Sequence, residues 1–378
     1  MPKITNIEIL KYSSEYGNKK VYGQPLNVRS GVIIKILLSS NIYGIGECYQ
    51  SAYLPEVSEN FYYFIKDSLI NKKTEDINMI LNSINVPFAC NSGFIKSLIS
   101  AIEIALCDAN AKFFKLPLYK YLNNNAKNKK INLYASSGSA IFNPNQIKED
   151  VLKIKNDGFK FYKMRLGYYP WQIDKKRILT AYSTFKNRNL MIDAIMGTLN
   201  KWNLEDFKKK INFFNSLKLK WIEEPLHPNK IVDYSKLKKI SKNELAIGES
   251  FTNYDEFFNA LSLKAADIFQ PDVTQLGFKT SFHVHEVLNK YKKKTVLHIW
   301  GSNISLLANL HFAIAANRIN LIEYPMVKLK LLENELKDIV TINQGVISLN
   351  DNVKGLGLDL NRYKLKKFKF VKKSGFKI

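Results

Sequence analysis

The sequence predicts an α/β fold: a (β/α)8 barrel of the TIM type with an α+β capping domain formed by the N-terminal segment and the C-terminal tail. In the second half of the chain, seven short apolar runs each end in polar residues, and these ends lie 23 to 30 residues apart. Each interval fits one strand and one helix, and such units close into a barrel with its active site at the carboxyl ends of the strands. The residues at these ends are Lys163 with Arg165, Asp193, Glu223, Glu249, Asp272, His298 and Glu323.

Residues 1–128 show a different order, with strand patterns first and helical patterns afterwards. The segments NIEILKY (6–12) and GVIIKILLSS (31–40) read as strands, and the glycine-punctuated stretch YGIGECYQS (43–51) follows them. A helical pattern covers FIKSLISAIEIALCDANAKFF (94–114). This order predicts a compact α+β capping domain over residues 1–128.

The repeating units begin near INLYAS (131–136), and we place the catalytic barrel at residues 129–325. Within it, NLEDFKKKINFFNSL (203–217) predicts a helix whose apolar stripe is formed by Leu204, Phe207, Ile211 and Phe214. Another helix is expected to start at Thr252, with an acidic residue three positions on. Residues 326–378 read as short strands and glycine turns that pack back on the capping domain.

Composition indicates a large cytoplasmic protein in a reducing compartment. The chain has 378 residues, 46% of them hydrophobic, and no apolar stretch of the roughly 20 residues that span a bilayer. No secretory signal is apparent, and the three cysteines show no metal-ligand spacing and predict no disulfide framework. We therefore expect no membrane association.

The net charge of +24 raises the question of a nucleic-acid partner. The lysines are spread along the chain, which favours a general compositional bias over a binding patch, so we expect no nucleic acid. The densest basic stretch, YKLKKFKFVKKSGFK (363–377), alternates in a way that suits an exposed edge strand.

Three acidic residues, Asp193, Glu223 and Glu249, end three successive predicted strands, so a barrel would place them side by side. Like charges at that distance repel unless a cation neutralises them. Carboxylate oxygens suit Mg²⁺, which keeps coordination positions for substrate. The alternative is that acidic residues after a strand simply favour the first turn of the next helix.

At these positions the sequence resembles the enolase superfamily, specifically its mandelate racemase and sugar-acid dehydratase branch. The matching words, in the family's order, are NIYGIGE, YKMR, MIDA, WIEEP, AIGES, IFQPDVTQLG, LHIWGSNI, IEYP and VKGLGLDL. The resemblance implies that Asp193, Glu223 and Glu249 are the ligands of Mg²⁺, with Glu224 outside the ligand set. The chain has Ile195 where the family often has asparagine, which leaves one polar contact near the metal open.

The resemblance also implies roles for two further residues. Lys163 is similar to the family lysine that touches the substrate carboxylate, and Glu323 to the residue that hydrogen-bonds the same group, for which it would be protonated. An ordinary ion-pair role is the alternative for each. The cap loops 13–23 and 48–57 are expected to close over the substrate, although no role is assigned to Lys19, Lys20, Tyr22 or Tyr49.

Asp272 and His298 lie on adjacent predicted strands, and a carboxylate bonded to one imidazole nitrogen raises the basicity of the other. His298 is the one histidine of five that ends a strand of the ring, so we expect it to be the catalytic base. His227, His283, His285 and His311 are expected to be structural or solvated.

Arg165 bears on the type of reaction. A guanidinium is protonated at neutral pH and cannot readily accept a proton, whereas racemisation needs a base on each face of the substrate. Arginine suits a second carboxylate or a pair of hydroxyls, and a salt bridge at the barrel mouth is the alternative.

We therefore expect a Mg²⁺-dependent dehydratase, a lyase, of a sugar acid, either an aldonate or an aldarate. It would remove the α-proton through a Mg²⁺-stabilised enolate and eliminate the β-hydroxyl to give a 2-keto-3-deoxy acid. The alternatives are a racemase or epimerase of an α-substituted carboxylate and, more remotely, a basic nucleic-acid-binding protein with an inactive barrel. The expected partner is a small-molecule carboxylate, and the expected assembly is a homo-oligomer, although no motif encodes either.

Overall fold

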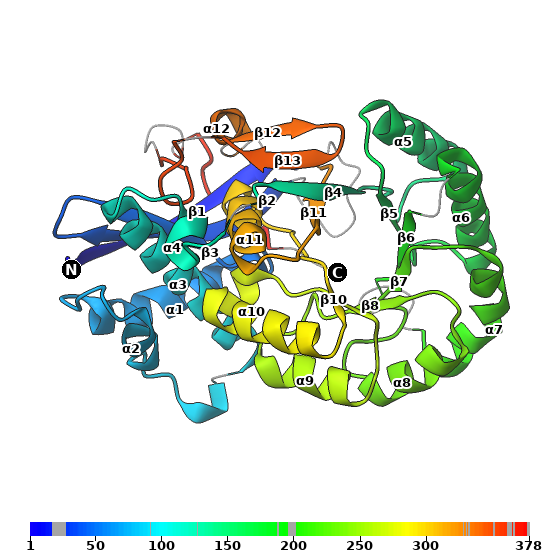
Figure 1. Ribbon diagram of the computed structural model, residues 1–378, viewed down its shortest axis with the longest axis horizontal. Coiled ribbons are helices and arrows are strands. Elements are labelled where there is room, and N and C mark those ends of the chain that lie inside the picture. The colour runs from blue at the N-terminus through cyan, green and yellow to red at the C-terminus, as the bar shows by residue number, and fades with distance from the viewer. Residues whose placement is uncertain are drawn as a thin grey trace.

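We analysed the chain in a computed structural model (Figure 1). It describes residues 1–16, 28–90, 92–126, 128–186, 189–195, 202–327, 329, 331, 333–350, 352–360, 365 and 367–375. Of the cap-loop residues considered above, Lys19, Lys20 and Tyr22 lie outside these ranges. None of the helices in the described ranges is both long enough and apolar enough to cross a membrane.

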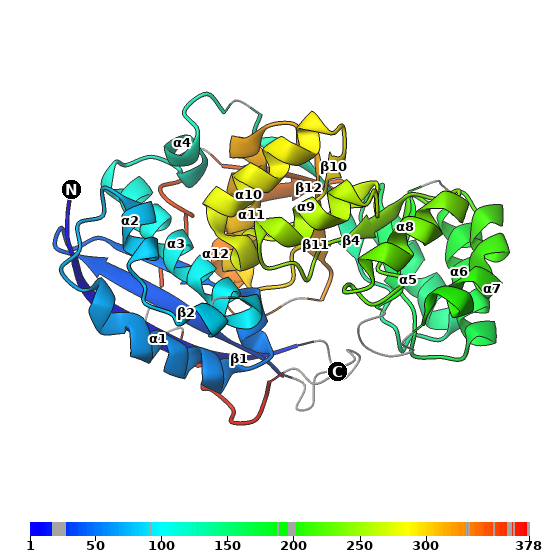
Figure 2. The same cartoon turned by 90° about the horizontal axis from the view of Figure 1, so that it is seen from below.

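The N-terminal segment forms an antiparallel sheet covered by helices. The strands are β1 (Ile4–Glu15), β2 (Val28–Leu38) and β3 (Tyr43–Glu47), in that order across the sheet. The helices are α1 (Pro55–Leu69), α2 (Ile77–Asn82), α3 (Gly93–Phe113) and α4 (Leu118–Leu122), with short 3-10 turns at Tyr49–Ala52 and Phe88–Cys90. Helix α3 packs against this sheet on one side and against the barrel helix α10 on the other (Figure 2).

The glycines of YGIGE are required by the contact between β3 and α3. A Cβ atom on Gly44 would lie 1.9 Å from the carbonyl oxygen of Ala105, and one on Gly46 would lie 1.9 Å from that of Ala101. Both distances are far below van der Waals contact, so no other residue fits without moving the helix. Two glycines at alternate positions of one strand therefore let α3 approach the cap sheet closely.

The rest of the chain closes into a barrel of parallel strands, with helices on its outside (Figure 1). Each strand pairs with the next along the chain, β11 pairs with β4, and a parallel bridge between Leu297 and Ile322 joins the last two. The strands are β4 (Lys130–Ser136), β5 (Tyr162–Arg165), β6 (Leu190–Asp193), β7 (Trp221–Glu223), β8 (Leu245–Ile247), β9 (Ile268–Phe269), β10 (Lys294–Thr295) and β11 (Leu321–Pro325).

A helix connects each strand of the barrel to the next. These helices are α5 (Pro144–Asn156), α6 (Trp171–Phe185), α7 (Leu204–Ser216), α8 (Ile231–Ile240), α9 (Tyr254–Ser262), α10 (Val273–Lys290) and α11 (Asn303–Ala316). The predicted barrel with an α+β cap is confirmed. It differs from eight full units in one respect: in the described residues after β11, the chain continues into α12 (Glu333–Ile339) and a hairpin, β12 (Val340–Asn343) and β13 (Val346–Leu349).

The barrel interior explains where the polar strand ends point. Tyr134, Met191, Trp221, Ala246, Ile268 and Val296 form a buried apolar cluster inside the strands. Asp193, Glu223 and His298 each follow a member of this cluster by two residues, and the side chains of residues i and i+2 lie on the same face of a strand. The polar residues therefore lie next to this buried apolar cluster, at the carboxyl end of the barrel.

Two predictions for the helices can be compared directly with the structure. In α7, Leu204, Phe207, Ile211 and Phe214 are buried, as the stripe predicts. The predicted start of α9 at Thr252 was wrong. Asn253 caps this helix and forms a capping box with Glu256, because its side chain accepts from the Glu256 amide while the glutamate reaches back to the Asn253 amide.

The residues after β11 contact both parts of the molecule. Strand β13 pairs antiparallel with β4 of the barrel, whereas the Gly355 carbonyl accepts from Leu118 and the Leu356 amide donates to Asp108 in the cap. The predicted edge strand in the basic tail is absent from residues 367–375. The Ser374 hydroxyl instead bonds the Val371 carbonyl and closes a turn, which competes with strand pairing.

Candidate active site

Three carboxylates converge at the barrel mouth. One oxygen each of Asp193, Glu223 and Glu249 can be chosen so that all lie within 4.8 Å of one another. Asp193 and Glu223 are register partners on β6 and β7, and Glu249 follows β8. Burial raises the pKa of Glu249 well above its usual range, and the neighbouring carboxylates Glu224 and Asp193 add to this rise. Three hard oxygen donors in a buried site fit a divalent cation such as Mg²⁺.

Lys163 lies among these carboxylates and is fully buried. Its Nζ atom lies 2.7 Å from Glu223, 3.0 Å from Glu323 and 3.3 Å from Asp193. Burial alone would lower the pKa of Lys163, but the surrounding carboxylates outweigh it and hold the pKa well above its usual range. Lys163 is therefore a fixed positive charge between the carboxylate trio and Glu323.

Arg165 points to the same side of β5 as Lys163. Its guanidinium lies 3.6 Å from Asp193 and 3.7 Å from Glu323, and it donates to the Ser136 hydroxyl at 2.9 Å. Its Cζ atom lies 4.5 Å from the ring centroid of Trp300. The arginine thus belongs to the site, and stacking on Trp300 fixes its plane.

Asp272 and His298 form a hydrogen-bonded pair, with 2.9 Å between Oδ2 and Nδ1. The other oxygen of Asp272 accepts from the backbone and hydroxyl of Thr274 and from the Asn309 amide, so the carboxylate is fixed. Nε2 of His298 faces Glu249 at 3.7 Å. Burial would lower the pKa of His298, but Glu249, Asp272 and Glu323 together raise it to about 9.

Glu323 lies among basic groups, and its protonation when it bonds the substrate carboxylate stays a prediction. Burial acts to raise its pKa, but Lys163, His298 and Arg165 outweigh it and lower the pKa to about 2. Its Oε2 atom also accepts from the Ile299 amide at 3.0 Å. The three basic groups around Glu323 therefore favour its charged form.

The two residues beside the trio that the resemblance singled out occupy unusual backbone conformations. Glu224 has φ +36° and accepts from the Gly248 amide, so it lies outside the converging set. Burial, with Glu223 and Asp193, raises the pKa of Glu224 to about 8. Ile195 has φ +45°, and its amide donates to Asp193 at 3.0 Å.

The remaining histidines contact other parts of the fold. His227 accepts from Asn229, His283 stacks on Tyr254, and His285 bonds Thr295. His311 accepts from the Tyr119 amide, and burial lowers its pKa to about 3.

Sequence reasoning missed several side chains that hold this site. Trp221 donates its indole N–H to Glu223 at 2.9 Å, and Asn309 fixes Asp272. A signal existed for both: Trp221 precedes Glu223 by two residues, and Asn309 is a lone amide in an apolar helix, where it must find a partner. Tyr49, left without a role, places its ring 5.0 Å from that of His298 and donates its hydroxyl to the Glu249 carbonyl.

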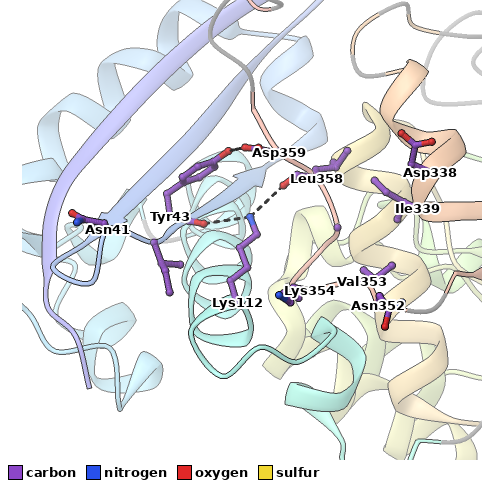
Figure 3. A pocket seen from close by; sticks show the side chains of 12 residues that line it. Asn41, Tyr43, Lys112, Asp338, Ile339, Asn352, Val353, Lys354, Leu358 and Asp359 are labelled. Atoms are coloured by element: carbon purple, nitrogen blue, oxygen red, sulfur yellow. Dashed lines mark hydrogen bonds between the residues drawn. The ribbon is translucent and has the colours of Figure 1, made fainter.

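A cavity of about 510 Å³ opens away from this site, between the cap and the C-terminal segment (Figure 3). Lys112 in its wall donates to the carbonyls of Tyr43 and Leu358 and to Asp108, and the Tyr43 hydroxyl donates to Asp359. These contacts join the cap strand β3, helix α3 and the C-terminal segment across the cavity.

Comparison with known proteins gives two family matches. Residues 146–364 match the family described as enolase C-terminal domain-like, and residues 24–122 match the N-terminal domain of mandelate racemase and muconate lactonizing enzyme. L-talarate/galactarate dehydratase of Salmonella typhimurium is 27% identical over 62% of this chain, and the match covers 58% of that relative's length.

Solved structures agree over nearly the whole chain. The 3,6-anhydro-D-galactonate cycloisomerase from Zobellia galactanivorans superimposes with a TM-score of 0.82 and 25% identity, covering 97% of this chain and 99% of that one. A mutant of L-talarate/galactarate dehydratase liganded with Mg and L-glucarate gives a TM-score of 0.84 at 22% identity, covering 98% and 92% of the two chains.

Proposed function

The chain belongs to the enolase superfamily, in the group that contains mandelate racemase and muconate lactonizing enzyme, and from this we propose that it is a Mg²⁺-dependent sugar-acid dehydratase. Relatives named as dehydratases and as cycloisomerases of sugar acids support an enzyme of this kind. The observation that carries the proposal is the asymmetry of the site, which has one histidine base and two cationic side chains.

Asp193, Glu223 and Glu249 would hold the ion, because one oxygen of each lies within 4.8 Å of the others. Bound there, Mg²⁺ would neutralise the negative charge that grows on the substrate carboxylate as the α-proton leaves. Lys163 would contact the same carboxylate from the other side.

His298 would perform both proton transfers. Its Nδ1 is bonded to Asp272, so Nε2 is the atom that faces the carboxylate trio and would take the α-proton. With a pKa of about 9, His298 acts as a base in its neutral form, which rising pH favours. The electrons of the broken C–H bond form the C=C bond as the β-C–O bond breaks, and the proton on Nε2 leaves with the hydroxyl as water. The enol product then tautomerises to the 2-keto-3-deoxy acid.

Within the described residues, the side of the site formed by Arg165 offers no second base. A guanidinium keeps its protons at neutral pH, so Arg165 cannot return a proton to the other face of the substrate, as racemisation requires. Relatives named as an epimerase and as cycloisomerases make proton transfer without net loss of water the second candidate.

One experiment separates these reactions. The protein is incubated with Mg²⁺ and a panel of aldonates and aldarates in D₂O, and keto product and recovered substrate are both analysed. We expect 2-keto-3-deoxy acid, no α-epimer in the recovered substrate, and no product from His298→Asn. An α-epimer carrying deuterium, with little keto product, would instead establish the epimerase.

A further inference from the structure

Trp300 lies between two guanidinium groups, one from the barrel and one from the cap. The Cζ atom of Arg165 lies 4.5 Å from the Trp300 ring centroid, and that of Arg29 lies 5.3 Å from the same centroid. Arg165 is in β5, whereas Arg29 is the second residue of β2. Trp300 follows His298 by two residues, so this contact joins the proposed catalytic site to the cap.

Within the described residues, Arg29 is a buried cation without an ion-pair partner. It is 3% exposed, and no carboxylate in the described ranges lies within 4 Å of it. It contacts the ring faces of Trp300 and of Tyr16, the latter at 5.5 Å, and it also acts on the Tyr16 hydroxyl. A ring face attracts the charge, but it does not satisfy five N–H donors, and burying an unpaired charge is costly.

Glu47 lies in the same region but does not use these donors. Its Oε1 atom accepts from the Tyr12 hydroxyl at 2.6 Å, and its Oε2 atom accepts from the amide and hydroxyl of Ser302. Burial raises the pKa of Glu47, and Arg29 is the weakest of the groups that oppose this rise. Glu47 therefore fixes the loop after His298, and it forms no ion pair with Arg29 within 4 Å.

Tyr16 adds a buried hydroxyl to the same place. Its ring meets Trp300 edge to face, with 6.2 Å between centroids, and Arg29 is the hydrogen-bonding neighbour of its hydroxyl within the described part of the chain. Burial raises the pKa of Tyr16, and Arg29 and Arg165 both oppose the rise. The Tyr16 hydroxyl therefore lies close enough to Arg29 and Arg165 for both guanidinium groups to lower its pKa.

We propose that Arg29, Tyr16 and Arg165 bind a second carboxylate of the substrate, which makes the substrate an aldarate rather than an aldonate. The inference rests on the proposed sugar-acid reaction for the position of the first carboxylate, which lies at Lys163 and the carboxylate trio. A terminal carboxylate neutralises buried guanidinium groups and accepts from their paired N–H donors. The primary hydroxyl at the end of an aldonate supplies no such charge, so it leaves Arg29 unpaired.

The test uses matched substrates that share stereochemistry at every chiral carbon and differ only at the terminal carbon. These are galactarate with galactonate, glucarate with gluconate, and mannarate with mannonate. Wild type, Arg29→Met, Arg29→Lys and Tyr16→Phe are compared in kcat/KM and, independently of turnover, in calorimetric binding with Mg²⁺ present. Arg318→Met is the matched control, because Arg318 is exposed and precedes β11 at the end of the barrel away from Glu323.

We expect wild type to prefer one diacid over its monoacid partner by about tenfold or more, and Arg29→Met to lose about 50-fold or more in kcat/KM on that diacid. The ratio of diacid to monoacid kcat/KM should fall at least about tenfold, with Tyr16→Phe intermediate and Arg318→Met like wild type. Arg29→Lys, which keeps the charge, covers the case in which Arg29→Met does not fold, and it should lose part of the same preference.

Equal losses on both members of a pair, or a wild-type preference for the monoacid, would overturn the second-carboxylate site. The reaction and the site can fail separately. Loss of diacid binding in Arg29→Met without any dehydration supports the site and contradicts the dehydratase, whereas dehydration of a monoacid with equal losses supports the dehydratase and contradicts the site.

Discussion

The Nζ atom of Lys163 lies 2.7 Å from Oε1 of Glu223, inside a cluster of carboxylates that are buried with it. The same ammonium lies 3.0 Å from Glu323, so one side chain neutralises groups from two strands. Removing one partner of a buried ion pair leaves the other charge uncompensated, which is costly.

Lys163→Met should therefore lower the free energy of unfolding by about 3 kcal/mol at pH 8 in EDTA. Urea denaturation of both proteins measures the difference. Lys208→Met is the control, because Lys208 pairs with Glu205 at the exposed surface, and its loss should change stability little. Equal stability of wild type and Lys163→Met would show that the carboxylates do not depend on this cation.

The proposed Mg²⁺ site predicts metal-dependent stabilisation. Mg²⁺ at about 100 times its dissociation constant should stabilise wild type by about 2.7 kcal/mol, because the ion binds the folded chain. Asp193→Asn and Glu249→Gln should lose this gain together with turnover, while Glu205→Gln, at an exposed position of α7, should keep both. Full activity in EDTA would contradict the site.

Much of the site could be predicted from the sequence, because the alternation of side chains along a strand and the order of the strands together determine which residues meet. Residues two apart share a face, and the carboxyl ends of parallel strands meet at one mouth, so Lys163, Asp193, Glu223, His298 and Glu323 could be placed together without coordinates. Contacts between the cap and the barrel follow no such rule. The stacking of Arg29 on Trp300 joins positions far apart in the chain and depends on how the two domains pack.

The protonation states of the buried site residues also could not be predicted from the sequence. Glu323 was expected to be protonated beside the substrate carboxylate, which stays a prediction; the three basic groups around it lower its pKa, and this balance depends on distances and burial. The N-cap of α9 is Asn253 rather than Thr252. The sequence could not decide between them, because both residue types cap helices well.

Asn309 is predicted to act as a positioning residue through Asp272. It donates to Asp272 at 2.9 Å and accepts from the Val273 amide at 3.0 Å. Asn309→Ala should lower kcat about 10- to 100-fold with little change in KM. Because Asp272 raises the pKa of His298, a displaced carboxylate should move the acidic limb of the kcat–pH profile to lower pH.

The control for Asn309 is Asn289→Ala, which removes a partner of His285 rather than of the catalytic pair. Asn289→Ala should leave the acidic limb of the kcat–pH profile at the same pH as in wild type. A loss of kcat in Asn309→Ala without movement of the limb would mean that the amide only supports the fold.

Ile195 is predicted to be strained. A β-branched residue rarely adopts positive φ, and Ile195 has φ +45° directly beside the trio. Asparagine tolerates this region better, so Ile195→Asn should raise the free energy of unfolding by about 1 kcal/mol, measured in urea. Ile195→Val keeps the branching and should gain nothing. Equal stability of the two variants would argue against strain.

Glu103 couples the cap to the barrel in a pH-dependent way. Its carboxylate accepts from the Lys279 amide at 2.9 Å, just after the break in α10 at Gly277, where a Cβ atom would lie 1.8 Å from Glu103 Oε2. Burial raises the pKa of Glu103 from its usual value of 4.5 to about 7, although the amides of Lys279 and Phe278 oppose the rise. Between these two values the folded chain holds a proton that the unfolded chain has lost.

Stability should therefore fall as pH rises from about 4.5 to 7 and then level off, with Glu103 contributing about 3 kcal/mol of the change. Glu103→Gln cannot ionise, so its free energy of unfolding relative to wild type should increase by about 2.5 kcal/mol between pH 5 and pH 8. Taking the difference between the two proteins cancels the other buried carboxyls, such as Glu224, whose pKa is also raised. Urea denaturation at several pH values, with exposed Glu205→Gln as control, measures the difference, and parallel curves for wild type and Glu103→Gln would show that Glu103 is ionised throughout.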